Sequence, residues 1–67
     1  MRIKVYKPDF DSHPEDGSTE SMDINVANVV NVTKDMYWKG MTYAEVKLIR
    51  GTYLITKESA DAIRDAI

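Results

Sequence analysis

The chain has 67 residues, no cysteine and a net charge of −2 from 9 basic and 11 acidic side chains. This length suits one small domain, the absence of thiols excludes disulfides and thiolate metal sites, and the near-neutral charge excludes a general attraction to nucleic acid or anionic membranes. Apolar runs of a few residues are too short to cross a bilayer, and the N-terminal residues lack the apolar core of a signal peptide. We therefore expect a single cytoplasmic domain over residues 1–67, without membrane contact.

The N-terminal stretch 2–7 has the alternation of a half-buried strand, with Ile3 and Val5 on one side. Pro8 ends this strand because proline cannot donate a backbone hydrogen bond to a neighbouring strand. Residues 8–22 contain no Lys or Arg and are rich in acidic, Ser and Thr side chains, with Phe10 as the only large apolar residue before position 22. This composition predicts a flexible acidic loop over 8–22.

Apolar alternation returns over residues 22–33. It loses its phase at Ala27 and Asn28, which predicts a bulge or turn that splits the stretch into two short strands. The next stretch, 33–42, is predicted to be a connection in which Gly40 can adopt a positive φ.

Two β-prone runs follow, at residues 42–49 and 52–55. About two residues separate them, and one of these is a glycine, which is typical of a β-hairpin. We therefore predict a hairpin with Arg50 and Gly51 at its tip.

The residues after position 57 carry apolar side chains on one helical stripe, which predicts a short C-terminal helix capped by Thr56 or Ser59. Such a short helix needs a surface to pack on. We predict an α+β fold of four or five antiparallel strands, either open or barrel-like, packed on this helix. The predicted core consists of Ile3, Val5, Ile24, Val26, Val30, Val32, Ala44, Val46, Leu48, Leu54, Ile63 and Ile67.

No complete catalytic or cofactor site is visible in the sequence. The three glycines are not clustered as a phosphate loop requires. The acidic segment matches a calcium loop in part, but Pro14 stands where that loop needs glycine. His13 is the only histidine, and Ser12 beside it has no rigid frame, so zinc binding and nucleophilic catalysis are not expected. We expect no enzyme activity, no cofactor and no metal.

Tyr37 and Trp38 lie between Lys34 and Lys39 and are the most informative exposed candidates. Rigid aromatic side chains dominate binding hot spots, and they also stack on unpaired bases. Three interpretations stay open for Trp38, namely a lid over the core, contact with a protein partner, and stacking on nucleic acid. The predicted partner-binding residues are Tyr37, Trp38, Lys39 and Lys34, and the alternative nucleic-acid site consists of Lys34, Lys39, Lys47 and Arg50.

The C-terminal third carries, in order, Leu48, Gly51, Ile55, Lys57, Glu58, Ser59 and Ile63. This order resembles the FlbD-like (swarming motility) small-protein family, in which a strand, a glycine turn, a strand ending in Lys-Glu-Ser and a short helix follow one another. LytTR-type DNA-binding domains are similar in their strand-rich layout that ends in a helix. Both resemblances imply a compact sheet with one helix that works by contact, and neither supplies a catalytic residue.

We therefore expect a non-enzymatic interaction module, a bacterial or phage regulatory or accessory protein, that binds a protein partner or self-associates. Dimerisation would add the buried surface that so short a chain lacks. The alternative is a nucleic-acid-binding domain.

Overall fold

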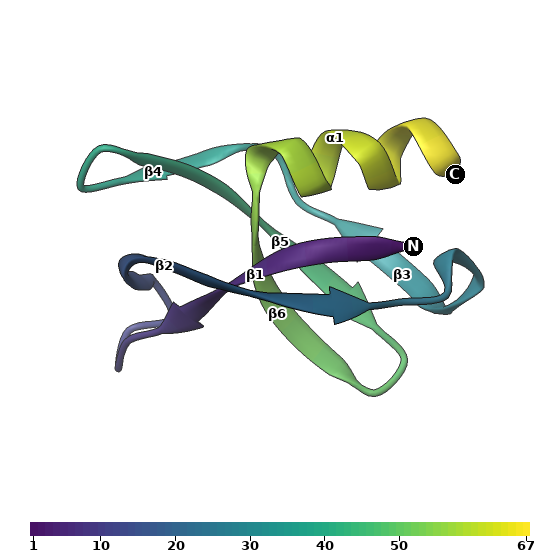
Figure 1. The fold of residues 1–67 in the computed structure, drawn as a ribbon, viewed down its shortest axis with the longest axis horizontal. Coiled ribbons are helices and arrows are strands. Elements are labelled where there is room, and N and C mark those ends of the chain that lie inside the picture. Colours follow the sequence, from purple (N-terminus) through teal and green to yellow (C-terminus); the bar gives the residue numbers. More distant parts are fainter.

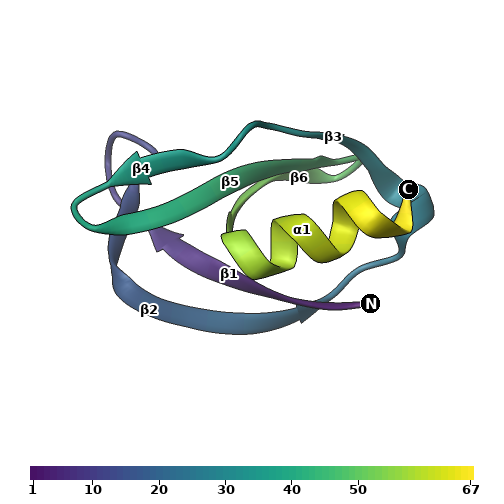
Figure 2. The ribbon, with the colours of Figure 1, turned by 90° about the horizontal axis from the view of Figure 1, so that it is seen from above.

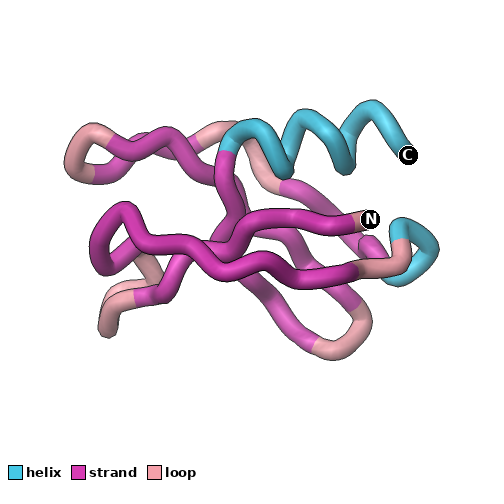
Figure 3. The backbone as a smooth tube through the Cα atoms, in the orientation of Figure 1, coloured by secondary structure: helices cyan, strands magenta, loops and turns pink.

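The computed structural model describes residues 1–67 as one antiparallel sheet of six strands with a single helix packed on it (Figures 1 and 3). The elements are β1 (Arg2–Pro8), β2 (Pro14–Asp23), the short 3-10 turn η1 (Val26–Asn28), β3 (Val29–Val32), β4 (Met36–Trp38), β5 (Met41–Leu48), β6 (Gly51–Thr56) and α1 (Lys57–Ala66). The strand order is β2-β1-β6-β5-β3, and β4 also pairs with β5. The α+β prediction is confirmed, but the sheet is not closed into a barrel and has more strands than the four or five predicted.

The extra strand is β4, which lies inside the predicted connection. It pairs with the first residues of β5 through a two-residue turn made of Lys39 and Gly40, whose φ angles are 47° and 83°. Positive φ at both central residues is the geometry of a type I′ turn, which matches the twist of the flanking strands and favours glycine. The expected positive φ of Gly40 is thus confirmed, and it makes the stretch a hairpin.

The one predicted hairpin is confirmed as β5 and β6, with its turn one residue earlier than expected. The register pairs Leu48 with Gly51, so Ile49 and Arg50 form the turn and Gly51 begins β6. Gly51 has no positive φ. Gly51 is therefore an ordinary strand residue. Of the two signals used for the prediction, only the two-residue spacing between the β-prone runs corresponds to the observed turn.

The predicted acidic loop is wrong over most of its length, because residues 14–23 form β2. This strand pairs with β1 in antiparallel register, and between the Tyr6 and Pro8 pairings residues 15–18 bulge out against Lys7 alone. Only residues 9–13 form the connecting loop. An edge strand takes its backbone partners from one neighbour and exposes its side chains to water, so it can form from polar residues that lack apolar alternation.

Helix α1 begins where the cap was predicted. The Thr56 hydroxyl oxygen accepts a hydrogen bond from the Ser59 backbone N–H at 3.2 Å, which satisfies one of the free N–H groups of the first turn. The Ser59 hydroxyl in turn accepts a bond from the Lys4 backbone N–H at 2.8 Å, which joins the helix to β1. At ten residues, α1 is neither long nor apolar enough to cross a membrane.

The predicted phase break at residues 27 and 28 is confirmed as η1, and it decides which valines are buried. Asn25 caps η1 by accepting a hydrogen bond from the Ala27 N–H at 3.0 Å. The register between β3 and β5 then shifts between Val29 and Asn31. This irregularity leaves Val30 59% exposed, whereas simple alternation predicted it in the core.

The core lies between the sheet and α1 and consists of Ile3, Ile24, Ala44, Val46, Leu48, Ile55, Ala60 and Ile63. Most of the predicted core is buried or packed against this cluster. The three exceptions are Val30 and Ile67, which are exposed, and Val26, which is half-buried in η1 and does not pack against the cluster. Ile67 follows the last residue of α1 and is exposed. Leu54 is buried as predicted, although it lies outside this cluster together with Tyr43, which the prediction omitted. The prediction also omitted Ile55 and Ala60.

We predict that Val46→Asp unfolds the protein and that Val30→Asp does not. Val46 is fully buried, so the substitution places an unpaired carboxylate in the core at a cost above about 4 kcal/mol, comparable with the whole stability of a small domain. Val30 is mostly exposed, so its aspartate stays hydrated. Circular dichroism melting of the two variants checks this, and a cooperative transition for Val46→Asp near the wild-type temperature would contradict the core as described.

Candidate protein-binding surface

Two hairpin tips lie at one end of the molecule, opposite the chain termini (Figure 1). One is the loop between β1 and β2, and the other is the β4–β5 turn. They are joined by stacked rings, since the centroids of His13 and Trp38 are 3.8 Å apart and the ring planes are 10° from parallel. Lys39 Nζ lies 5.5 Å from the Trp38 ring, within the range of a cation–π contact.

The loop between β1 and β2 is held by Asp9. Its Oδ1 accepts hydrogen bonds from the N–H groups of Asp11 and His13, at 2.8 and 2.9 Å, and its own N–H donates to the His13 carbonyl oxygen at 2.8 Å. Ser12 adopts a positive φ of 61° to complete the loop. The hydrogen bond from His13 N–H, supported by that from Asp11, holds the pKa of Asp9 below its usual value, because these donors favour the ionised carboxylate. The loop is therefore internally hydrogen-bonded.

This loop presents Phe10, whose side chain is fully exposed to water. On the neighbouring hairpin Tyr37 is 72% exposed, and Trp38 is half-buried. We call Phe10, His13, Tyr37, Trp38 and Lys39 the aromatic end. Sequence reasoning found three of these residues but missed Phe10 and His13, because their loop was predicted to be unstructured.

Trp38 is not a lid over the main core. It is absent from the residues that pack against the core cluster, and its ring covers His13. The Nδ1 atom of His13 is buried without a hydrogen-bond partner, 3.9 Å from Asp9 Oδ1. Stacking on Trp38, together with the bonds of the loop backbone, therefore fixes the imidazole in place.

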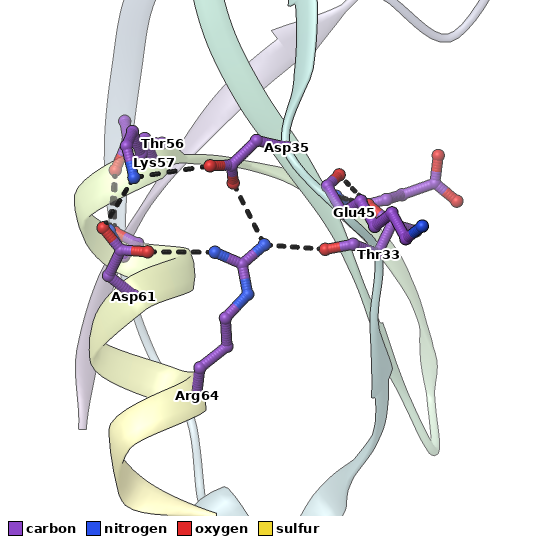
Figure 4. A network of polar contacts seen from close by, with 9 residues as sticks. Thr33, Asp35, Glu45, Thr56, Lys57, Asp61 and Arg64 are labelled. Carbon is purple, nitrogen blue, oxygen red and sulfur yellow. Dashed lines mark hydrogen bonds and ion pairs between the residues drawn. The ribbon is translucent and has the colours of Figure 1, made fainter.

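A charged network anchors the chain segment that leads into β4 (Figure 4). Arg64 of α1 donates to the Thr33 carbonyl oxygen at 2.7 Å, to Asp35 Oδ1 at 3.0 Å and to Asp61 Oδ1 at 2.9 Å. Lys57 Nζ lies 2.9 Å from Asp61 Oδ2 and 3.3 Å from Asp35 Oδ2. We call Asp35, Lys57, Asp61 and Arg64 the clamp, which ties α1 to the residue just before β4 and so to Tyr37 and Trp38.

Only three of the four clamp residues can be grouped from the sequence. Lys57, Asp61 and Arg64 are spaced four and three residues apart, which predicts ion pairs along one helix face. Asp35 lies far away in sequence and joins only because β3 passes beside the helix. The hydrogen bond from Arg64, together with Lys57, lowers the pKa of Asp35, and the bonds to Asp61 and then Asp35 raise the pKa of Lys57.

The basic residues of the nucleic-acid alternative are not gathered in one place. Lys39 and Arg50 lie in the turns at the two ends of the eight-residue strand β5, which places them roughly 26 Å apart at the rise of an extended strand. Lys34 and Lys47 are exposed between those ends. Of the four, only Lys39 belongs to the aromatic end.

Acidic and histidine side chains do not gather into a metal site. No group of three or more His, Asp or Glu side chains is placed to hold an ion. Asp9 uses a carboxylate oxygen within its own loop, whereas Glu20 lies in β2 opposite Val5. The partial calcium-loop pattern is therefore spread over a loop and a strand.

Comparison with protein-family models gave no match, and comparisons with curated proteins and with solved structures gave no significant one. The resemblance to the FlbD-like family stays a prediction.

We predict that Asp35→Asn lowers the urea midpoint at about pH 7 and has little effect at about pH 2. A carboxyl group whose pKa is lowered by folding stabilises the folded state above its unfolded pKa, and this contribution is lost as the pH falls through the folded value. Denaturation curves at the two pH values measure the difference. Glu45→Gln, which neutralises a carboxylate outside the clamp, is the control, and equal losses for Asp35→Asn at both pH values would contradict the role of the ion pairs.

We predict that His13→Ala exposes the only tryptophan. Removal of the imidazole uncovers one face of the Trp38 ring, so its emission moves to longer wavelength and acrylamide quenches it more strongly. Phe10→Ala, a substitution in the same loop, serves as the control and leaves both properties unchanged. Identical spectra for His13→Ala and the wild type would show that the rings do not stack in solution.

Proposed function

We propose that this protein is a non-enzymatic interaction module that binds a protein partner through the aromatic end. The observation that carries the proposal is Phe10, a fully exposed aromatic side chain at the tip of a hydrogen-bonded loop. Burying such a side chain in a complex contributes about 2 to 3 kcal/mol to the binding free energy. The free protein does not gain this energy, because Phe10 stays in water. Tyr37 offers a second exposed ring on the adjacent hairpin.

Rigidity supports the same proposal. A loop that is already ordered loses less conformational entropy on binding, so more of the contact energy appears as affinity. The bonds to Asp9 order the loop that carries Phe10, and the His13–Trp38 stack joins it to the hairpin that carries Tyr37. The clamp anchors the same hairpin from the helix side.

The charges around the aromatic end favour a protein over a nucleic acid. Asp9 and Asp11 lie in the same loop as Phe10, and Lys39 lies on the other hairpin. A rim with both signs around aromatic side chains is typical of a protein–protein interface. A phosphate backbone would meet the two carboxylates at close range, which opposes binding.

The test is capture of partners from the native cell extract on immobilised protein. Phe10→Ala and Tyr37→Ala each change a side chain that the fold does not need, so we expect both to lose a partner that the wild type retains. With the purified partner, each substitution should weaken binding about 30-fold, the size of a hot-spot loss of about 2 kcal/mol.

Ile49→Ala is the matched control, because Ile49 is 75% exposed in the turn at the other end of β5. It removes a comparable apolar side chain and should retain every partner. If Phe10→Ala and Tyr37→Ala also retain every partner, the aromatic end is not the binding site. Binding that falls steeply as salt rises from low to moderate concentration would instead support the nucleic-acid alternative.

A further inference from the structure

β2 is the outermost strand on one side of the sheet, so one of its backbone edges has no neighbouring strand (Figure 2). Over residues 19–23 it pairs residue by residue with β1 without a bulge. The irregular segment 15–18 lies before this stretch, and the strand ends at Asp23. We call residues 19–23 the free edge.

Two sets of hydrogen bonds determine which backbone groups of the free edge point outward. The Lys4 N–H donates to the Ser59 hydroxyl, so the Lys4 backbone faces away from β2, and that of its pairing partner Ser21 faces away from β1. Met1 and Ile24 exchange two backbone bonds, of 2.8 and 2.7 Å, and alternation from that pair gives the same result. The N–H and C=O groups of Thr19, Ser21 and Asp23 therefore point outward, and none of them has a hydrogen-bond partner outside the strand ladders.

The opposite side of the sheet is less suited to pairing. There β3 has four residues, and its register with β5 shifts in the middle. Short strands, bulges, lysines and prolines are the usual means by which proteins block an open edge. The free edge contains no lysine, proline or bulge, and the charge of Asp23 is already paired with Arg2 at 3.1 Å.

We propose that the free edge pairs with the free edge of a second copy of this chain, in antiparallel register about a two-fold axis through Ser21. In this register Ser21 lies opposite Ser21 of the second copy, and Thr19 lies opposite Asp23. All three are residues with outward-facing backbone groups, so each such pair exchanges two hydrogen bonds. Centring on Ser21 uses every free group of the edge, whereas any shift leaves some of them unpaired.

The side chains fit this register without a conflict of charge. Glu20 lies opposite Met22 of the second copy, whose chain is long and uncharged. A shift that centred the pair on Glu20 would place the two Glu20 carboxylates directly opposite each other, which is unfavourable. The small Ser21 side chain on the axis leaves room for the strands to approach.

Five residues from each chain make an interface smaller than a standard protein–protein interface. The fraction of dimer therefore rises and falls with the protein concentration. Its contacts are almost entirely backbone hydrogen bonds. The pairing lies outside the aromatic end and does not depend on the proposed function.

The decisive substitution is Ser21→Pro, compared with Ser21→Ala. Proline removes an N–H that points away from β1, so the β1–β2 ladder keeps its bonds, and proline is accepted at such edge positions. Alanine removes the hydroxyl and keeps the N–H. In sedimentation experiments over increasing concentration we expect dimers for wild type and Ser21→Ala, and for Ser21→Pro a dimer at least about tenfold weaker.

A measurement on the wild type decides the question even if Ser21→Pro does not fold. Amide hydrogen exchange at Thr19, Ser21 and Asp23 should slow as the concentration rises, whereas the amides of Glu20 and Met22, which donate to β1, should already be slow. Phe10→Ala should dimerise like the wild type, which separates this proposal from that on the aromatic end. A monomer up to millimolar concentration, or undiminished dimers of a folded Ser21→Pro, would overturn the self-pairing. Protection of the three amides only on addition of another protein would assign the edge to a foreign strand and overturn it too.

Discussion

The hydrogen bond from the Lys4 N–H to the Ser59 hydroxyl connects the first strand to the helix that ends the chain, across 55 residues. It matters because β1 has little other pairing on that side, with Val5 and Ile55 as its only register pair to β6. The bond, together with the burial of Ile3 in the same core cluster as Ile63, holds the β1–β2 hairpin against the rest of the sheet. The Lys4 N–H therefore points toward the helix, and alternation along the paired strands then sets which backbone groups of residues 19–23 in β2 point outward.

Local patterns were sufficient for much of this fold. The helix, its Thr56 cap, the β5–β6 hairpin and the break at residue 27 all follow from side chains within a few positions of one another. What the patterns could not supply was pairing over long distance. β2 has no apolar alternation of its own and forms because β1 offers it a backbone partner, and the bulge beside Val30 reverses the side that alternation assigns.

The residues of the candidate site also fall into those that local sequence patterns could select and those that depend on contacts between distant segments. Tyr37, Trp38 and Lys39 could be selected from sequence as rigid aromatic and basic side chains in a connection. His13 and Phe10 could not, because their positions depend on the loop that Asp9 orders and on the meeting of two hairpins that are distant in sequence. The same holds for Asp35, which meets Lys57 and Arg64 only in the folded chain.

The contacts of β1 with α1 and β6 also bear on the folding rate. Neither the Lys4–Ser59 bond nor the Val5–Ile55 pair can form until nearly the whole chain has been brought back on itself. Closing so large a loop costs entropy before any contact repays it. We therefore expect docking of the first strand to require closure of nearly the whole chain. We also expect folding on the timescale of milliseconds to seconds that is typical of β-rich topologies rather than of small helical bundles.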